Sequence, residues 1–194
     1  MSKMSAISRA DFFKAFAIGA LVPMAVWLLD RLPRTQRLRR VLRPPGALAE
    51  KNFLSACIRC GQCANVCPNK CITLDGMEEG LAGLAAPIIT ARAQACILCM
   101  ACTEVCPTGA LQSLPTEAVQ MGTAHVAEDI CYSYAGRTCG VCYRACPLPG
   151  KAMTLGLYET PRVNAAHCVG CGLCEQACVH MPQAIRVIPR KEAA

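Results

Sequence analysis

The sequence is poor in aromatic residues and lacks the fingerprints of the common enzyme cofactors. Phe, Tyr and Trp make up 5% of its 194 residues. No C-x₂-C pair is followed by His, which excludes c-type haem attachment. No G-x-G-x-x-G stretch is present, which argues against a dinucleotide-binding fold. Because no substrate site is recognisable either, we expect this chain to have no catalytic site of its own.

Cysteine, in contrast, is abundant and regularly spaced. The chain has 17 cysteines, and Cys57-Ile-Arg-Cys60-Gly-Gln-Cys63-Ala-Asn-Val-Cys67-Pro68 is the bacterial ferredoxin ligand run C-x₂-C-x₂-C-x₃-C-P. A disulfide-stapled secreted domain would favour an even count. Zinc ribbons separate their C-x₂-C pairs by roughly 12–20 residues and place no third cysteine at +3. The spacing therefore predicts iron–sulfur clusters.

The ligand run recurs three times along the chain. The second run, Cys96 to Cys106, is intact and is followed by Pro107. The third run starts at Cys131 and resumes at Cys139 after a gap of seven residues, and the fourth has Val179 in place of the proline. Four [4Fe–4S] clusters are predicted, with sixteen ligands: Cys57, Cys60, Cys63, Cys67, Cys96, Cys99, Cys102, Cys106, Cys131, Cys139, Cys142, Cys146, Cys168, Cys171, Cys174 and Cys178.

Two cysteines need separate consideration. Cys131 is the least secure ligand, since the alternative is a free cysteine, with a three-iron cluster or a non-cysteine ligand at that site; we retain it as a ligand. The insertion Tyr132–Thr138 is expected to form a surface loop, which makes it a candidate docking element. Cys71 is the one cysteine left over, and its apolar surroundings predict a buried packing thiol.

The spacing of the runs predicts the fold class. The runs start 35 to 39 residues apart, and each unit reads as a ligand loop, a short helix and a two-stranded return such as Ile72–Leu74 with Pro87–Thr90. Two units make one ferredoxin fold, so we expect an α+β body with two bacterial-ferredoxin-like 2[4Fe–4S] folds in residues 44–194. The fourth cysteine of each run should serve the other cluster of its fold.

The sequence leaves the pairing of the runs open. Sequential pairing joins runs one and two and runs three and four, whereas nested pairing joins one with four and two with three. We favour nested pairing slightly, because it places Cys57 and Cys178 in one fold and so draws the two ends of the body together. Either arrangement allows the four clusters to line up as a path for electrons.

Other residue types occur between the ligands. Four glycines, at 61, 140, 170 and 172, are expected to adopt positive φ and bring backbone amides near a cluster. Arg59 and Arg144 either raise the potential of a nearby cluster or are solvated surface residues. The three histidines are expected to be surface or supporting residues, with His167 able to donate to a cluster sulfur.

The net charge of the chain is concentrated at its start. Residues 1–43 hold nine basic and two acidic residues, which is the whole formal excess of +7, and residues 44–194 are balanced. Each oxidised cubane with four thiolates would add roughly two negative charges to that balanced part. A negative body poor in aromatics is a poor nucleic-acid binder, so no nucleic-acid partner is expected. The basic segment adjoins an apolar run, which indicates a membrane surface.

Residues 1–43 are therefore predicted to be a signal or anchor helix with a basic flank. The stretch Ser8–Lys14 resembles a twin-arginine export signal, with Ala10 where the second arginine belongs. The apolar run Ala15–Leu29 would extend about 22 Å as a helix, with Pro23 inside it. A signal peptide, an uncleaved anchor, an interfacial helix and a buried core helix remain alternatives. We favour the anchor or interfacial helix, contacting the membrane through residues 12–43, followed by a stiff linker, Arg43-Pro-Pro-Gly46.

The chain also resembles a known family. The carrying residues are Arg43-Pro-Pro-Gly-Ala-Leu, Ala56-Cys-Ile-Arg-Cys-Gly-Gln-Cys, Cys139-Gly-Val-Cys-Tyr-Arg-Ala-Cys-Pro and His167-Cys-Val-Gly-Cys-Gly-Leu-Cys-Glu-Gln-Ala-Cys-Val. They are similar to the MauM/NapG ferredoxin-type proteins over about residues 43–189. The gapped third run and the missing proline of the fourth are the specific marks.

The resemblance implies a carrier of four [4Fe–4S] clusters, usually exported and associated with the periplasmic face of the cytoplasmic membrane. Such a protein would take electrons from an integral-membrane quinol-oxidising partner and pass them to a downstream redox protein, a terminal reductase or cytochrome. Two alternatives stay open. One is an accessory iron–sulfur protein that matures a partner enzyme, and the other is the cluster subunit of a cytoplasmic oxidoreductase.

Overall fold

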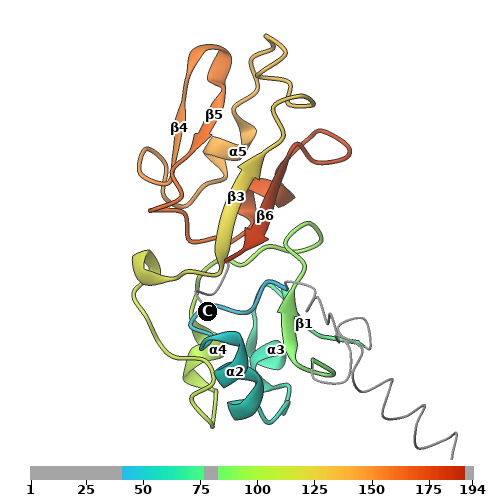
Figure 1. The fold of residues 1–194 in the computed structure, drawn as a ribbon, viewed down its shortest axis with the longest axis vertical. Coiled ribbons are helices and arrows are strands. Elements are labelled where there is room, and N and C mark those ends of the chain that lie inside the picture. Colours follow the sequence, from blue (N-terminus) through green and yellow to red (C-terminus); the bar gives the residue numbers. More distant parts are fainter. Residues whose placement is uncertain (1–40, 77–82, 191–194) are drawn as a thin grey trace, which may run out of the picture. The chain divides into compact units, whose positions relative to one another are not determined.

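The computed structural model describes residues 41–76 and 83–190, which combine short helices with short antiparallel strands (Figure 1). The helix expected within residues 12–43 lies almost wholly outside the described residues. The helices are α2 (Glu50–Ala56), α3 (Gln62–Val66), α4 (Ala101–Glu104), α5 (Val141–Arg144) and α6 (Leu173–Gln176), with 3-10 turns η2 (Thr116–Ala118) and η3 (Leu157–Glu159). The strands are β1 (Ile72–Leu74), β2 (Pro87–Ile89), β3 (Gly122–Val126), β4 (Met153–Leu155), β5 (Pro161–Val163) and β6 (Ile185–Pro189).

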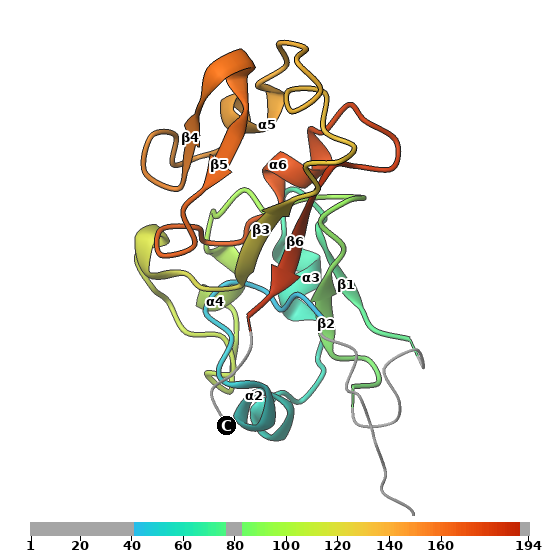
Figure 2. The same cartoon turned by 45° about the horizontal axis from the view of Figure 1, so that its top comes forward.

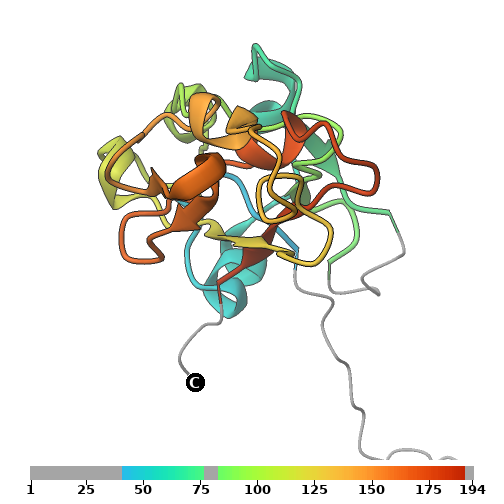
Figure 3. The same cartoon turned by 90° about the horizontal axis from the view of Figure 1, so that it is seen from above.

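The second half of the described chain has two strand pairs around runs three and four. Strand β3, before run three, pairs antiparallel with β6, after run four, from Gly122 opposite Pro189 to Val126 opposite Ile185. Between the two runs, β4 and β5 form an antiparallel hairpin. Strands β3 and β6 stay side by side when the molecule is turned (Figures 2 and 3). The outer strands thus join the ends of this half, and the inner hairpin connects its two ligand runs.

The first half repeats this scheme with a shorter outer pair. Strands β1 and β2 form the antiparallel hairpin between runs one and two, as the sequence predicts. The outer pair is reduced to one bridge, Ala47 with Leu111, flanked by the Gln112 N–H donating to the Gly46 carbonyl across 2.8 Å. A Cβ on Gly46 would lie 1.9 Å from the Gln112 carbonyl oxygen, so only glycine fits there. The architecture is a ferredoxin-like double fold.

The preference for nested pairing is wrong, because the runs pair sequentially. Helix α3 of run one packs against α4 of run two, and α5 of run three packs against α6 of run four. The inner hairpins explain this arrangement, since each one reverses the chain and returns the next run to the side of the previous one. The connection from run two to run three contains β3, which pairs with β6 in the other half.

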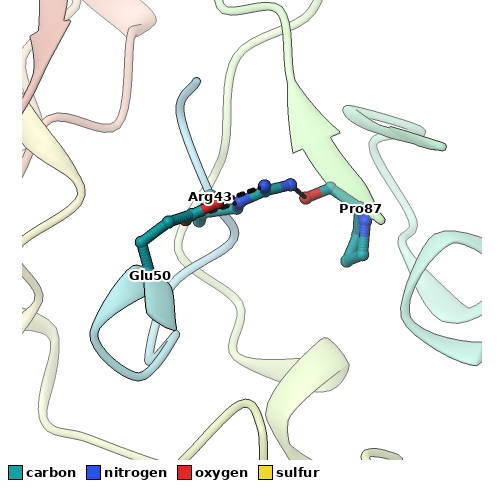
Figure 4. A network of polar contacts seen from close by, with 3 residues as sticks. All are labelled: Arg43, Glu50 and Pro87. Atoms are coloured by element: carbon teal, nitrogen blue, oxygen red, sulfur yellow. Dashed lines mark hydrogen bonds and ion pairs between the residues drawn. The ribbon is translucent and has the colours of Figure 1, made fainter. Parts of the chain in front are cut away.

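The prediction of a stiff linker at Arg43-Pro-Pro-Gly46 is also wrong, because this stretch belongs to the packed body. Pro44 and Pro45 are fully buried, and Arg43 is only 8% exposed. The Arg43 guanidinium donates to both carboxylate oxygens of Glu50, at 2.6 and 3.0 Å, and to the Pro87 carbonyl at 3.0 Å (Figure 4). It also lies 5.1 Å from the Phe53 ring centroid. A bidentate ion pair fixes the entry of the chain against α2 and β2.

Candidate iron–sulfur sites

Four cavities in the body are each lined by four of the sixteen predicted ligand cysteines. We name each cavity after the run that supplies three of them. The sets are Cys57, Cys60, Cys63 and Cys106 for the run-one cavity; Cys96, Cys99, Cys102 and Cys67 for the run-two cavity; Cys131, Cys139, Cys142 and Cys178 for the run-three cavity; and Cys168, Cys171, Cys174 and Cys146 for the run-four cavity. No predicted ligand is left outside a set.

The fourth cysteine of every run lines the cavity of the neighbouring run. Cys67 of run one lines the run-two cavity, and Cys106 of run two lines the run-one cavity. Cys146 and Cys178 are exchanged in the same way between runs three and four. This exchange follows from the chain geometry, because the short helix that contains the third cysteine carries the fourth away from its own loop and toward the adjacent one.

Cys131 lines the run-three cavity despite the altered spacing of its run. The inserted residues fold back locally, with the Ala135 N–H donating to the Cys131 carbonyl at 3.1 Å and the Arg137 N–H donating to the Tyr132 carbonyl at 3.0 Å. The insertion therefore closes on itself and leaves Cys131 beside the other three cysteines. Tyr132 is exposed and meets His180 edge to face, with ring centroids 4.9 Å apart.

The ligand loops bring backbone N–H groups to the cysteine sulfurs. The Leu98 N–H donates to the Cys96 Sγ at 3.4 Å, the Leu111 N–H to the Cys106 Sγ at 3.5 Å and the Ala124 N–H to the Cys168 Sγ at 3.5 Å. Positive φ makes these tight loops possible. All four glycines expected to adopt it do so: Gly61, Gly140, Gly170 and Gly172. Arg59, Leu98 and Met100 take the same conformation without being glycine.

The cavities have the composition that a cluster requires. Among the residues that line them there is no Asp, Glu or Lys, and apolar side chains fill most of the walls between the cysteines. Their volumes, counted with the open mouths, are about 270 to 380 Å³, so all four suit one kind of occupant. Within the described part of the chain no set of three or more His, Cys, Asp or Glu side chains is arranged to hold a single metal ion. The thiols are spread round cavity walls, and a cubane has an iron at each of four corners to receive them.

Burial controls the protonation of the cysteine thiols in these cavities. It raises the pKa of Cys102 to about 12 and those of Cys142 and Cys171 to about 11, and neighbouring cysteines add like-charge repulsion. Burial also raises the pKa of Cys174 and of Cys63. Cys106 is an exception. Burial would raise its pKa, but hydrogen bonds from Leu111 and Thr108 outweigh burial and lower it. Since iron binds thiolates, loading of these sites must release protons.

Cys71 lies in the wall of the run-two cavity as a fifth cysteine. It is 3% exposed, and its Sγ is 3.5 Å from the Cys67 Sγ. A hydrogen bond with Cys71 lowers the pKa of Cys96, while the pKa of Cys71 itself is raised by that bond and by burial. Cys71 is therefore the thiol that keeps its proton and donates it. The prediction of a buried thiol is confirmed, but its contact with cluster-site sulfurs carried no signal in the sequence.

The charged residues within the runs have local partners or local roles. Arg144 is mostly exposed, pairs with Glu159 at 3.3 Å and also donates to the Cys139 carbonyl. His167 is exposed, and it is the Ala124 N–H that donates to the Cys168 sulfur. His180 lines the run-three cavity, with its Nδ1 2.7 Å from the Pro182 carbonyl oxygen. The sequence did not single out Phe53, which is fully buried and lines the run-one cavity.

Comparison with known proteins finds an iron–sulfur family model along part of the chain. The family model described as a 4Fe-4S dicluster domain matches residues 56–110 and 95–148. The first match contains the two runs that exchange cysteines in the structure. The second joins run two to run three, which line cavities in different halves, so the order of runs along the chain does not by itself give their pairing. The fourth run lies outside both matches.

Relatives with most of this chain in common are ferredoxin-type proteins. The "Methylamine utilization ferredoxin-type protein MauM" of Methylobacillus flagellatus is 43% identical over 163 residues, 78% of this chain and 69% of the relative. That of Methylophilus methylotrophus is 40% identical over 199 residues, 94% of this chain and 87% of the relative. The "Ferredoxin-type protein NapG" of Escherichia coli is 38% identical over 185 residues, 88% and 79% respectively. The chain therefore belongs to the MauM/NapG family of ferredoxin-type proteins, and it is an iron–sulfur electron-transfer protein with four [4Fe–4S] clusters.

Proposed function

We propose that this chain relays electrons in a respiratory complex, from an integral-membrane quinol-oxidising partner to a terminal reductase or cytochrome. The observation that carries the proposal is the grouping of all sixteen run cysteines, four by four, round four cavities of one body. We assign these sixteen cysteines as the cluster ligands, with the fourth cysteine of each run serving the neighbouring run's cluster. A chain with four redox centres is suited to passing electrons on.

The protein's own residues have three tasks in this relay. The cysteine thiolates bind iron, the apolar walls exclude water, and the loop N–H groups of Leu98, Leu111 and Ala124 stabilise negative charge on sulfur. A bound cluster supplies one-electron redox chemistry, and its potential depends on net charge, hydrogen bonds to sulfur and exposure to solvent. These features hold the electron inside the protein and leave substrate chemistry to the partners.

The proposed membrane contact is the N-terminal segment, and the described body begins beside the first two cavities. Residues 1–40 carry eight basic and two acidic residues. Arg43 is not counted with them, because it is paired with Glu50 inside the body. Phe53 and Pro87, which contact Arg43, line the run-one cavity, and Pro45 lines the run-two cavity. We assign the run-one and run-two end as the place where electrons arrive from the membrane, with the body on the periplasmic face. No helix within the described ranges has the length and apolarity to span a bilayer.

Cluster reduction by quinol in membranes tests this function. Membranes that contain the full chain and its native partners are given a quinol under anaerobic conditions, and the reduced clusters are counted by electron paramagnetic resonance (EPR). The relay predicts reduction by quinol and reoxidation when the terminal acceptor is added. Clusters that stay oxidised with quinol but reduce with dithionite would contradict it and favour an accessory role. A periplasmic activity reporter fused after Ala194 should be active; inactivity would place the body in the cytoplasm.

A further inference from the structure

We infer that electrons cross between the two halves by one route, between the run-two and run-four cavities through the contact of Cys96 with Cys171. The redox centres then form a single line in the order run one, run two, run four, run three, which differs from their order in the sequence. This inference rests on the proposed relay and specifies its internal path. It also leaves the run-one and run-three cavities as the two ends of the line.

A direct backbone hydrogen bond joins the two cavities. The Cys96 N–H donates to the Cys171 carbonyl oxygen at 2.9 Å. Cys96 lines the run-two cavity and Cys171 the run-four cavity, so the bond connects residues whose side chains face the two redox centres. A path of covalent bonds with one hydrogen bond therefore leads from one sulfur to the other.

The hydrophobic cores also meet at this contact between the Cys96 and Cys171 segments, which we call the junction. Cys171 is buried in the core that contains Cys96 and Cys102, together with Cys63, Cys67 and Cys71 of the first half. Cys174, from the same ligand loop, is buried in the second core with Met153 and Ile185. The run-four loop thus spans the boundary between the halves and has one ligand cysteine on each side of it.

An electron that moves along this line oxidises one centre and reduces the next, with no bond formed or broken.

Close backbone fit holds the junction together. Gly172 has φ +86°, and a Cβ there would lie 2.3 Å from the Ala91 Cβ. The Gln176 side chain of α6 accepts from the Ala95 N–H and donates to the Ala93 carbonyl, both at 3.3 Å. Both contacts hold the segment that leads into Cys96. They place α6 and its ligand loop directly on the first half.

The chain offers a matched pair of substitutions to test the route. Gly172→Ala adds a methyl group that must displace Ala91 and so loosens the junction. Gly150→Ala is the control, because Gly150 lies outside the lining of the four cavities and has a similar φ of +79°, yet its Cβ would meet nothing within 4 Å. Backbone strain is similar in the two variants, and the clash at the junction differs.

The measurement is EPR of the loaded full chain after reduction by dithionite, with iron counted in the same samples. Neighbouring reduced clusters broaden each other's signals. We expect Gly172→Ala to retain its iron and to lose the part of the broadening that comes from clusters in different halves, whereas Gly150→Ala should match the unchanged protein. A fully loaded Gly172→Ala chain with unaltered broadening would overturn the route.

A second variant decides the outcome if Gly172→Ala loses clusters. Gln176→Leu removes the bonds from α6 to Ala93 and Ala95 without a clash on the backbone, and the same partial loss of broadening is expected. Unchanged broadening in loaded Gln176→Leu would then overturn the inference. The quinol assay and the broadening measurement test different claims. If quinol reduces the clusters but the variants show unaltered broadening, only the route between the halves is rejected. If quinol does not reduce the clusters but the variants show altered broadening, only the proposed relay is rejected.

Discussion

The Sγ atoms of Cys67 and Cys71 lie 3.5 Å apart in the wall of the run-two cavity. Cys67 is one of the four cysteines assigned to that cluster, and Cys71 is the one cysteine of the chain outside the four sets. The run-two site therefore has a buried S–H donor beside its ligand sulfurs. A donor to sulfur stabilises the more negative, reduced state and raises the reduction potential.

Replacing Cys71 should shift one potential and leave the cluster count unchanged. A hydrogen bond worth about 1 kcal/mol corresponds to roughly 40 mV for a one-electron step, so Cys71→Ala should make one of the four clusters harder to reduce by about that amount. Cys71→Ser, which keeps a donor, should shift it less. The measurement is an EPR-monitored redox titration with iron analysis. Loss of a whole cluster in both variants would instead identify Cys71 as a ligand.

The ion pair of Arg43 with Glu50 should contribute strongly to the stability of the body. The Arg43 side chain is 9% exposed and that of Glu50 28%, and removing one member of a buried pair costs about 3 kcal/mol. Arg43→Met should therefore lower the denaturant midpoint at which the loaded protein loses its visible absorbance. Lys151→Met is the control, since its pair with Glu117 is 66% and 70% exposed and should contribute less than about 1 kcal/mol. Equal midpoints for the two variants would refute the role given to Arg43.

Mild acid should accelerate cluster loss. Burial raises the pKa of Cys102 to about 12 and those of Cys142 and Cys171 to about 11, from an ordinary value of 9.0. The empty folded sites therefore hold protons below these values, and protons compete with iron for the thiols. Cluster loss to a chelator should slow steadily as the pH rises from about 6 to about 8.5. A rate independent of pH would show that proton uptake by these thiols does not accompany release.

The same raised pKa values predict that the stability of the apoprotein falls, rather than rises, at high pH. Below pH 9.0 these thiols are protonated in both the folded and the unfolded chain, so their contribution to stability is fully present. As the pH rises from 9.0 toward 11 and 12, the unfolded thiols ionise before the folded ones, and stability falls. Unfolding of the apoprotein, followed by circular dichroism, should show this loss. Constant stability over that range would contradict it.

Spacing alone could predict which cysteines line the four cavities, because a ligand run is a local feature. Residues close together in the chain determine the spacing of the sixteen cysteines, the positive φ of Gly61 and Gly172, and the hairpin of β1 with β2. The exchange of Cys67 with Cys106 was also predictable, since each run carries its fourth cysteine beyond its own loop.

Long-range packing could not be predicted in the same way. Sequential and nested pairing use the same runs, and the choice depends on how α3 meets α4 and how Cys96 meets Cys171. Arg43 looked like part of a basic flank because its partner Glu50 and the Pro87 carbonyl become neighbours only in the folded body. Two prolines and a glycine after it suggested a linker, yet the prolines are buried in the core.

Cys131 allows a direct test of the altered third run. Its cavity also contains Cys139, Cys142 and Cys178, so Cys131→Ala should disturb one cluster only. Iron per chain should fall from about 16 toward about 12, or to about 15 if a three-iron cluster remains. Cys71→Ala, which removes a cysteine assigned no iron, is the control. Unchanged iron in Cys131→Ala would mean that another group serves as the fourth ligand.

The central claim is that each cluster takes three cysteines from one run and the fourth from its sequential partner. Iron content of paired substitutions tests it most directly, because Cys57 shares a cavity with Cys106 and not with Cys67. The double variant Cys57→Ala with Cys106→Ala should lose no more clusters than either single variant, whereas Cys57→Ala with Cys67→Ala should lose the sum of its two singles. The reverse result, an additive loss for Cys57 with Cys106 and no added loss for Cys57 with Cys67, would contradict the account.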